Sequence, residues 1–190
     1  MKQEKTAVVA VQGLSVSRQM IAAVLAIVAA VALPQVFHFI GAISGSGTVP
    51  GSVFSPMHLP VILVGLLAGP LAGGLAGLFS PVVSHFISGM PGAMMVPLMM
   101  AELAGYGVIA GLLCNVKIPC ILKVLIAQIG GRLVYALAIL VAVNLFGKIN
   151  FSVSSIISSV IAGLPGLLLQ WAFIPLIMYR IKGHKSRSRI

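Results

Sequence analysis

Residues 20–40, MIAAVLAIVAAVALPQVFHFI, carry no charged side chain and are long enough to cross the hydrocarbon core of a bilayer as one helix. Similar apolar runs recur along the chain: 59% of the 190 residues are apolar and 7% are charged. An average soluble domain has about a quarter charged residues. This composition cannot supply the polar coat that a water-soluble domain needs. We therefore expect an all-α integral membrane protein.

Glycine, proline and polar residues divide the apolar sequence into six segments. They predict helices at about 19–40, 57–69, 72–89, 93–115, 121–146 and 154–180. Residues 41–56 form the one long polar connection, and a basic tail follows at 181–190. We expect residues 1–190 to form a single membrane domain, a bundle of six transmembrane helices.

The second segment, 57–69, is short for a full span, because 13 residues make only about 20 Å of helix. It is either tilted and shielded by its neighbours, or it joins the third segment in a hairpin. The hairpin would leave five spans and put the two termini on opposite sides.

Lysine and arginine concentrate on one predicted side of the membrane. With six spans, the N-terminus, the turn near residue 118 and the C-terminal tail share that side. They hold Lys2, Lys5, Arg18, Lys117, Lys123, Arg180, Lys182, Lys185, Arg187 and Arg189 of the twelve basic residues, whereas the opposite side has only Lys148. The positive-inside rule then places both termini in the cytoplasm. The net charge of +10 thus lies beside membrane spans, where it contacts lipid headgroups, so we expect no nucleic-acid partner.

Two ionisable residues, Glu102 and Arg132, fall near the middle of the predicted fourth and fifth helices. A charge at the bilayer centre costs about 2.5 to 3.5 kcal/mol on insertion scales, so it needs a partner or a wet cavity. The two residues are expected to meet as an ion pair. The pair is either structural or the floor of a solute-binding cavity.

Other polar residues are predicted near the outer ends of the helices. His38, His58 and His85 all fall on that side. Together they suggest an outward-facing polar pocket for a small molecule. The candidate substrate-binding residues are His58, His85, Glu102, Tyr106, Arg132, Tyr135 and Asn144. Neither the histidines nor Cys114 and Cys120 have the spacing of a metal site, so we expect no metal and no cofactor.

No catalytic motif is found in the sequence. The chain has only two acidic residues, and it has neither a Gly-rich phosphate loop with Lys nor a G-x-S-x-G or H-E-x-x-H motif. We therefore expect no enzyme activity. Active transport would need energy from a partner or from an ion gradient.

Small residues recur at four-residue spacing in two places. Ala22, Ala26 and Ala30 form such a seam in the first helix, which permits close helix approach. The seam serves either internal packing or docking of another membrane subunit. Gly65, Gly69, Gly73 and Gly77 have the same spacing, for which hairpin packing is expected; Gly107 and Gly111 are expected to serve the fourth helix similarly.

Several short motifs occur in a recognisable order. They are SPMHLPV (55–61), GLLAGP (65–70), GGLAG (73–77), SGMP (88–91), AELAGYG (101–107), GR (131–132) and AGLPG (162–166), followed by Gln170 and Pro175. Over about residues 19–180, this pattern resembles the substrate-binding S components of energy-coupling factor (ECF) vitamin transporters.

The resemblance implies a six-helix S component in a bacterial plasma membrane. Such a subunit captures a micronutrient from outside and docks on a transmembrane T component that carries two cytoplasmic ATPases. The resemblance also favours docking as the role of Ala22, Ala26 and Ala30, and it gives the 41–56 loop the role of capping the site. Lys2 stands where nickel and cobalt members have a histidine. A small organic vitamin or precursor is thus implied, of the hydroxymethylpyrimidine, pyridoxine or pantothenate class.

Two other functions fit the same residues. The chain could be a stand-alone secondary transporter with Glu102 as the coupling carboxylate. It could also be a structural membrane subunit without a ligand, in which Glu102 and Arg132 only hold helices together.

Overall fold

The computed structural model describes residues 14–45, 54, 56–146 and 163–187, and these residues form helices and connections without a strand. The helices are α1 (Val16–Ile43), α3 (His58–Ala68), α4 (Pro70–Ser88), α5 (Val96–Leu112), α6 (Cys120–Phe146) and α8 (Leu164–Arg187). From α1 to α6, each boundary lies within three residues of the predicted one. Most of the 41–56 loop, Lys148 and the predicted helix start at 154 lie outside the described residues.

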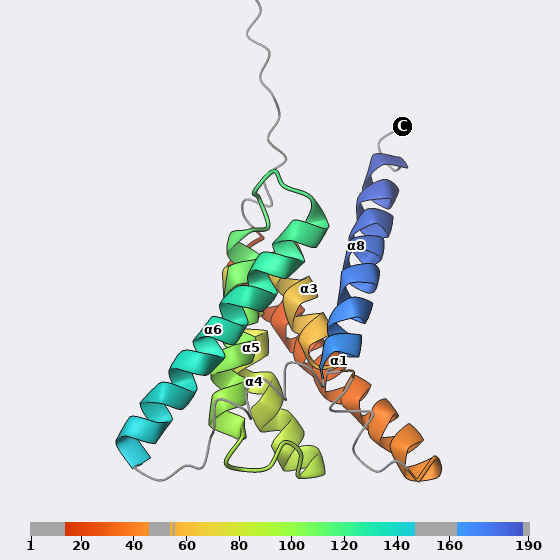
Figure 1. Cartoon of the computed structure of the whole chain (residues 1–190). Coiled ribbons are helices and arrows are strands. Elements are labelled where there is room, and N and C mark those ends of the chain that lie inside the picture. The colour runs from red at the N-terminus through yellow and green to blue at the C-terminus, as the bar shows by residue number, and fades with distance from the viewer. Residues whose placement is uncertain (1–13, 46–53, 55, 147–162, 188–190) are drawn as a thin grey trace, which may run out of the picture.

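Successive helices run in alternating directions (Figure 1). The start of α1, the α3–α4 turn, the α5–α6 connection and the end of α8 lie at the upper end of the bundle in that view. The ends of α1, α4 and α6 lie at the lower end. α4 and α5 form the centre, α1 and α3 pack beside them, and α6 packs on the other side of α5. α8 contacts mainly α6.

Four of the described helices are long and apolar enough to cross a membrane, namely α1, α4, α6 and α8. α5 and α3 are apolar but shorter, with 17 and 11 residues. α3 is enclosed by α1, α4 and α5, and most of its residues are buried. This enclosure agrees with the shielded alternative for the second segment. Six full spans remain a prediction.

Glycines end two helices at sharp turns. Gly69 separates α3 from α4 with φ of 98°, and Gly89 ends α4 with φ of 70°, both in the region that disfavours residues with a side chain. Pro70 then begins α4, where its missing N–H leaves no hydrogen bond unmade. α5 begins at Val96 rather than near residue 93, because the residues after Gly89 form a turn in which Met95 N–H donates to the Gly92 carbonyl.

Glycines also bring α4 and α5 into backbone contact. A Cβ built on Gly73 would overlap the backbone of Gly107, and one built on Gly77 would overlap the backbone at Leu103. Gly111 meets Pro70 in the same way. The four-residue glycine series therefore packs on α5, instead of joining α3 to α4 as the hairpin expectation had it. Such close approach between small residues is a principal way in which membrane helices associate.

The alanine seam of α1 faces the chain's own core. Ala26 and Ala30 are buried and Ala22 is partly buried, within a cluster that includes residues of α3 and α4. The exposed face of α1 carries larger residues, among them Leu25 and Val28. The seam thus packs internally in this structure, and its role in partner docking stays a prediction.

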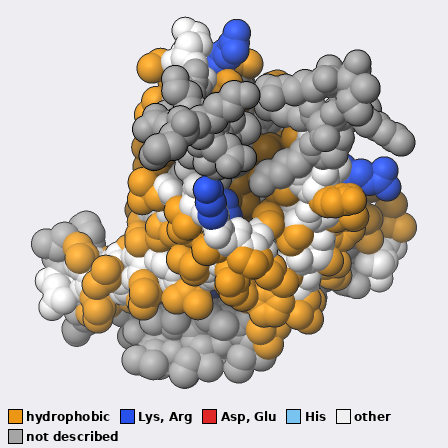
Figure 2. Space-filling view, turned by 90° about the horizontal axis from the view of Figure 1, so that it is seen from above, with side chains coloured by type: hydrophobic (Ala, Val, Ile, Leu, Met, Phe, Trp, Pro, Cys, Tyr) orange, Lys and Arg blue, Asp and Glu red, His pale blue; other side chains and the backbone are white. Residues whose placement is uncertain are grey.

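The outer surface is that of a protein dissolved in lipid. Large hydrophobic side chains are exposed along α1, α6 and α8. Figure 2, seen from the upper end of Figure 1, shows Lys and Arg side chains standing among hydrophobic ones. Arg18, Lys117 and Arg180 are exposed basic residues at the start of α1, in the α5–α6 connection and near the end of α8.

α8 continues to Arg187, past the predicted end near residue 180. The predicted tail at 181–190 is thus helical over most of its length. Lysine and arginine are good helix formers, and cations are favourable near a helix C-terminus because they complement the helix dipole.

Candidate functional site

An ion pair lies in the middle of the bundle. Arg132 Nη1 is 2.9 Å from Glu102 Oε1, which confirms the predicted contact. Glu102 is the seventh residue of α5, and Arg132 is the thirteenth of the 27 residues of α6. Glu102 is only 4% exposed. The pair therefore joins two helices at mid-depth and makes each charge tolerable there.

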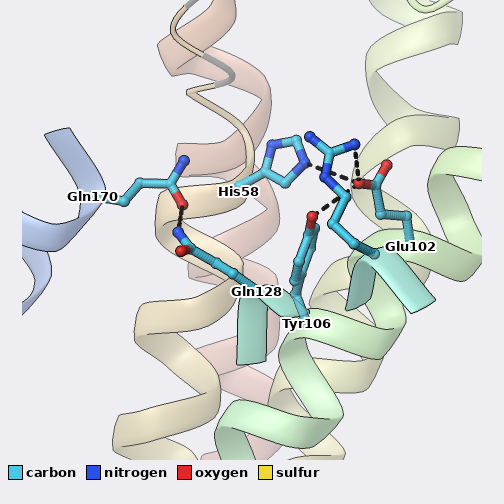
Figure 3. A network of polar contacts seen from close by, with 6 residues as sticks. His58, Glu102, Tyr106, Gln128 and Gln170 are labelled. Atoms are coloured by element: carbon cyan, nitrogen blue, oxygen red, sulfur yellow. Dashed lines mark hydrogen bonds and ion pairs between the residues drawn. The ribbon is translucent and has the colours of Figure 1, made fainter. Parts of the chain in front are cut away.

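Tyr106 and His58 complete this cluster (Figure 3). The Tyr106 hydroxyl donates a hydrogen bond of 2.9 Å to Glu102 Oε1, one helical turn away on α5. His58, the first residue of α3, has its Nε2 4.0 Å from the same oxygen. Its ring meets the Tyr106 ring edge-on at 5.1 Å between centroids. We call His58, Glu102, Tyr106 and Arg132 the acidic cluster.

Gly131 explains how Tyr106 reaches this position. A Cβ on Gly131 would overlap the Tyr106 ring. The missing side chain lets the ring lie on the backbone of α6, directly beside Arg132. The GR dipeptide of the sequence thus serves the cluster with both of its residues.

The other predicted site residues lie at different distances from this cluster. Tyr135 is one turn beyond Arg132 on α6, buried with Leu98 and Ile139. Asn144 is exposed and donates to the Leu140 carbonyl, about 18 Å further along the helix than Arg132.

His85 is in the last turn of α4, where its Nδ1 lies 2.8 Å from the Pro91 carbonyl oxygen. Eight residues, or about 12 Å of helix, separate it from Gly77, which contacts α5 beside Glu102 at Leu103. The structure therefore brings His58, Glu102, Tyr106 and Arg132 together, with Tyr135 adjacent. It does not bring His85 or Asn144 to them.

A second polar cluster was not predicted. Gln128 of α6 donates to Gln170 Oε1 of α8 at 3.0 Å, and Trp171 Nε1 donates to Gln128 Oε1 at 2.6 Å. Both glutamines are buried. We call these three residues the amide cluster; it lies in the same view as the acidic cluster in Figure 3. The signal in the sequence was the presence of glutamine inside long apolar helices, where a polar side chain needs a hydrogen-bond partner.

The two clusters offer hydrogen bonds and one neutralised charge pair to a small molecule. Among the described residues, no three His, Cys, Asp or Glu side chains come together as a metal ion would require. The chemistry of both clusters suits recognition of polar groups on a solute.

Comparison with known proteins identifies the family. Residues 7–183 match the family model described as "ECF transporter, substrate-specific component". No curated protein and no solved structure matches the chain. The match covers nearly the whole sequence and agrees with the apolar helices and the absence of strands among the described residues. The chain therefore belongs to the substrate-specific components of the ECF transporters, a family of membrane transport proteins.

Proposed function

We propose that this protein is the substrate-binding S subunit of an ECF importer in a bacterial plasma membrane. In this proposal six helices span the membrane, with both termini in the cytoplasm, and the acidic cluster forms part of a solute site open to the outside. The solute is a small water-soluble vitamin or vitamin precursor of the pantothenate, pyridoxine or hydroxymethylpyrimidine class. A transmembrane T component with two cytoplasmic ATPases supplies the energy for release inward.

The observation that carries the proposal is the acidic cluster itself. Arg132, Tyr106 and His58, from α6, α5 and α3, converge on one carboxylate oxygen of Glu102 in a largely apolar bundle. Ionisable residues inside a membrane helix bundle are rare and typically mark a substrate or ion pathway. The family match gives that pathway its function, because the family is one of substrate-specific components.

The position of Glu102 supports this function over secondary transport. A carboxylate that couples transport to protons must take up and release a proton during the cycle. Glu102 Oε1 is instead held by two contacts inside the bundle, the Arg132 guanidinium and the Tyr106 hydroxyl, each at 2.9 Å, which makes it a fixed acceptor. The pair is therefore better suited to fixing a solute's orientation than to carrying protons.

The decisive test is binding and transport by the purified full chain. Native mass spectrometry of the chain is expected to show a co-purifying small molecule. Titration with pantothenate, pyridoxine and hydroxymethylpyrimidine is expected to show that one of them binds the isolated subunit. Uptake into proteoliposomes is expected only when the T component, the ATPases and ATP are present.

A matched pair of variants connects binding to the cluster. Arg132→Gln removes the partly buried guanidinium and should weaken solute binding at least tenfold, whereas Arg180→Gln removes an exposed one and should leave binding unchanged. Proton-driven uptake by the chain alone would establish the secondary-transport alternative. If none of the three solutes bound and no small molecule co-purified, a structural subunit would be the better description.

A further inference from the structure

The hydrogen bonds of the amide cluster run in one direction. The Trp171 indole N–H sets that direction. The Trp171 indole N–H can only donate, so Gln128 must present its oxygen to it. The Gln128 amide nitrogen then points the other way and donates to Gln170, which must present its own oxygen. Hydrogen bonding therefore sets the orientation of both amides.

This chain of hydrogen bonds ends in a donor. Gln170 Nε2 is buried and has no hydrogen-bond partner within the described part of the chain. Gln170 as a whole is 2% exposed. A buried N–H group without an acceptor costs about 1 to 3 kcal/mol, so a membrane protein that keeps one there is expected to use it.

Gln170 also stands out on its own helix. The buried residues of α8 whose side chains the structure describes are Gly166, Gln170, Ile174 and Met178, and Gly163, just before the helix, is buried as well. These positions repeat every three or four residues, so they form one stripe. Gln170 is its single polar member. The hydrogen bond to α6 uses only the oxygen of Gln170, and its nitrogen has no acceptor among the residues that the structure describes.

The acidic cluster has a second donor of this kind. Arg132 Nη1 is paired with Glu102, but Arg132 Nε is buried and has no partner among the described residues. Arg132 follows Gln128 by one turn of α6, about 6 Å along the helix. In Figure 3 the Gln170 side chain extends from α8 toward the region of His58, and its amide nitrogen points away from Gln128.

The buried oxygens of the two clusters have hydrogen-bond partners. Glu102 Oε1 receives Arg132 and Tyr106, and the oxygens of Gln128 and Gln170 each receive an N–H. No buried side-chain oxygen of the described residues lacks a partner, whereas buried nitrogens do. The groups without a partner at Gln170 and Arg132 are donors, so a ligand that pairs with them must bring acceptors. Carboxylate and carbonyl oxygens suit this best, because each has two lone pairs and a guanidinium prefers them.

We infer that Gln170 Nε2 and Arg132 Nε bind a carboxylate or carbonyl oxygen of the transported solute. The inference rests on the proposed function and narrows its substrate class. Of the three candidate solutes, only pantothenate carries a carboxylate and an amide carbonyl. Pyridoxine and hydroxymethylpyrimidine have ring nitrogens and hydroxyl groups instead.

The test is titration of the purified full chain at pH 8 with each of these three compounds. Wild-type protein is expected to bind pantothenate most tightly. Gln170→Glu retains the oxygen that accepts from Gln128 but loses the donor, and it should weaken pantothenate binding at least tenfold. Gln19→Glu makes the same chemical change at the start of α1, where Gln19 bonds the Leu14 carbonyl, and should stay within twofold of wild type.

A second variant and a fold readout separate binding from packing. Gln170→Met removes the donor without adding a charge, and it is expected to lose binding to a similar extent. Trp171 is the only tryptophan, so its fluorescence reports whether the amide cluster is intact in each variant. A purely structural role for Gln170 predicts that Gln170→Glu, which keeps the contact with Gln128, binds as wild type does.

The possible outcomes distinguish the two proposals. Wild-type affinity in a folded Gln170 variant would overturn the inference and leave the proposed function standing. Tighter binding of pyridoxine or hydroxymethylpyrimidine than of pantothenate would do the same. If wild-type protein bound none of the three compounds, the inference would fail, and if in addition no small molecule co-purified, the proposed function would fail as well.

Discussion

Neutralising Glu102 is expected to destabilise the protein by leaving Arg132 without its counter-charge. Glu102→Gln has nearly the same shape and can still accept from Tyr106 and Arg132, so it changes the charge and little else. Removing one partner of a buried ion pair costs about 3 to 5 kcal/mol. A charge at mid-membrane costs about 2.5 to 3.5 kcal/mol on insertion scales.

The Arg132 side chain keeps 23% of its exposure, which argues for the lower part of these ranges. We therefore expect a loss of about 3 kcal/mol in the free energy of unfolding, or about 150-fold in the folding equilibrium. The assay is reversible unfolding in mixed micelles at pH 8, followed by the fluorescence of the single tryptophan, Trp171.

The double variant Glu102→Gln/Arg132→Gln serves as the control. It removes both charges, so it should recover at least half of the lost stability while failing to bind solute. If the double variant were as unstable as the single one, the loss would come from shape or hydrogen bonding. The charge argument would then be wrong.

Two further predictions concern close packing. Gly131→Ala should displace the Tyr106 ring and weaken solute binding at least tenfold. Gly130→Ala meets only the end of a flexible isoleucine side chain and should bind the solute normally. Equilibrium binding measures both variants, and equal affinities would contradict the packing argument. Ala26→Trp should lower the thermal unfolding temperature of the isolated subunit, because Ala26 is buried. Leu25→Trp should not lower it, because Leu25 is exposed and faces away from the core. An unchanged unfolding temperature of Ala26→Trp together with lost uptake would instead favour the docking role.

The helices were predictable because their signals are local. Apolar runs and the glycine and proline residues between them give each boundary from α1 to α6 within three residues. The contact between Glu102 and Arg132 was also predictable, although 30 residues separate them, because two opposite charges at membrane depth have few other ways to be satisfied.

The remaining parts of the site depend on distances that a sequence pattern does not contain. His85 and Asn144 share a predicted side with His58, but rise along the helices separates them from the acidic cluster. The contact between Gln128 and Gln170 joins neutral residues 42 positions apart, so it could not be predicted from opposite charges in the sequence. Which helix a glycine seam meets is likewise set by the three-dimensional arrangement, as Gly73 and Gly107 show.

The meeting of Gly73 with Gly107 has a mechanical consequence. Where two main chains touch with no side chain between them, no rotamer change can widen the gap or let one helix slide past the other. α4 and α5 are therefore expected to move as one rigid unit. A shape change that admits a solute is therefore expected in the helices around this pair, and α8, which among the described helices contacts mainly α6, is the first candidate.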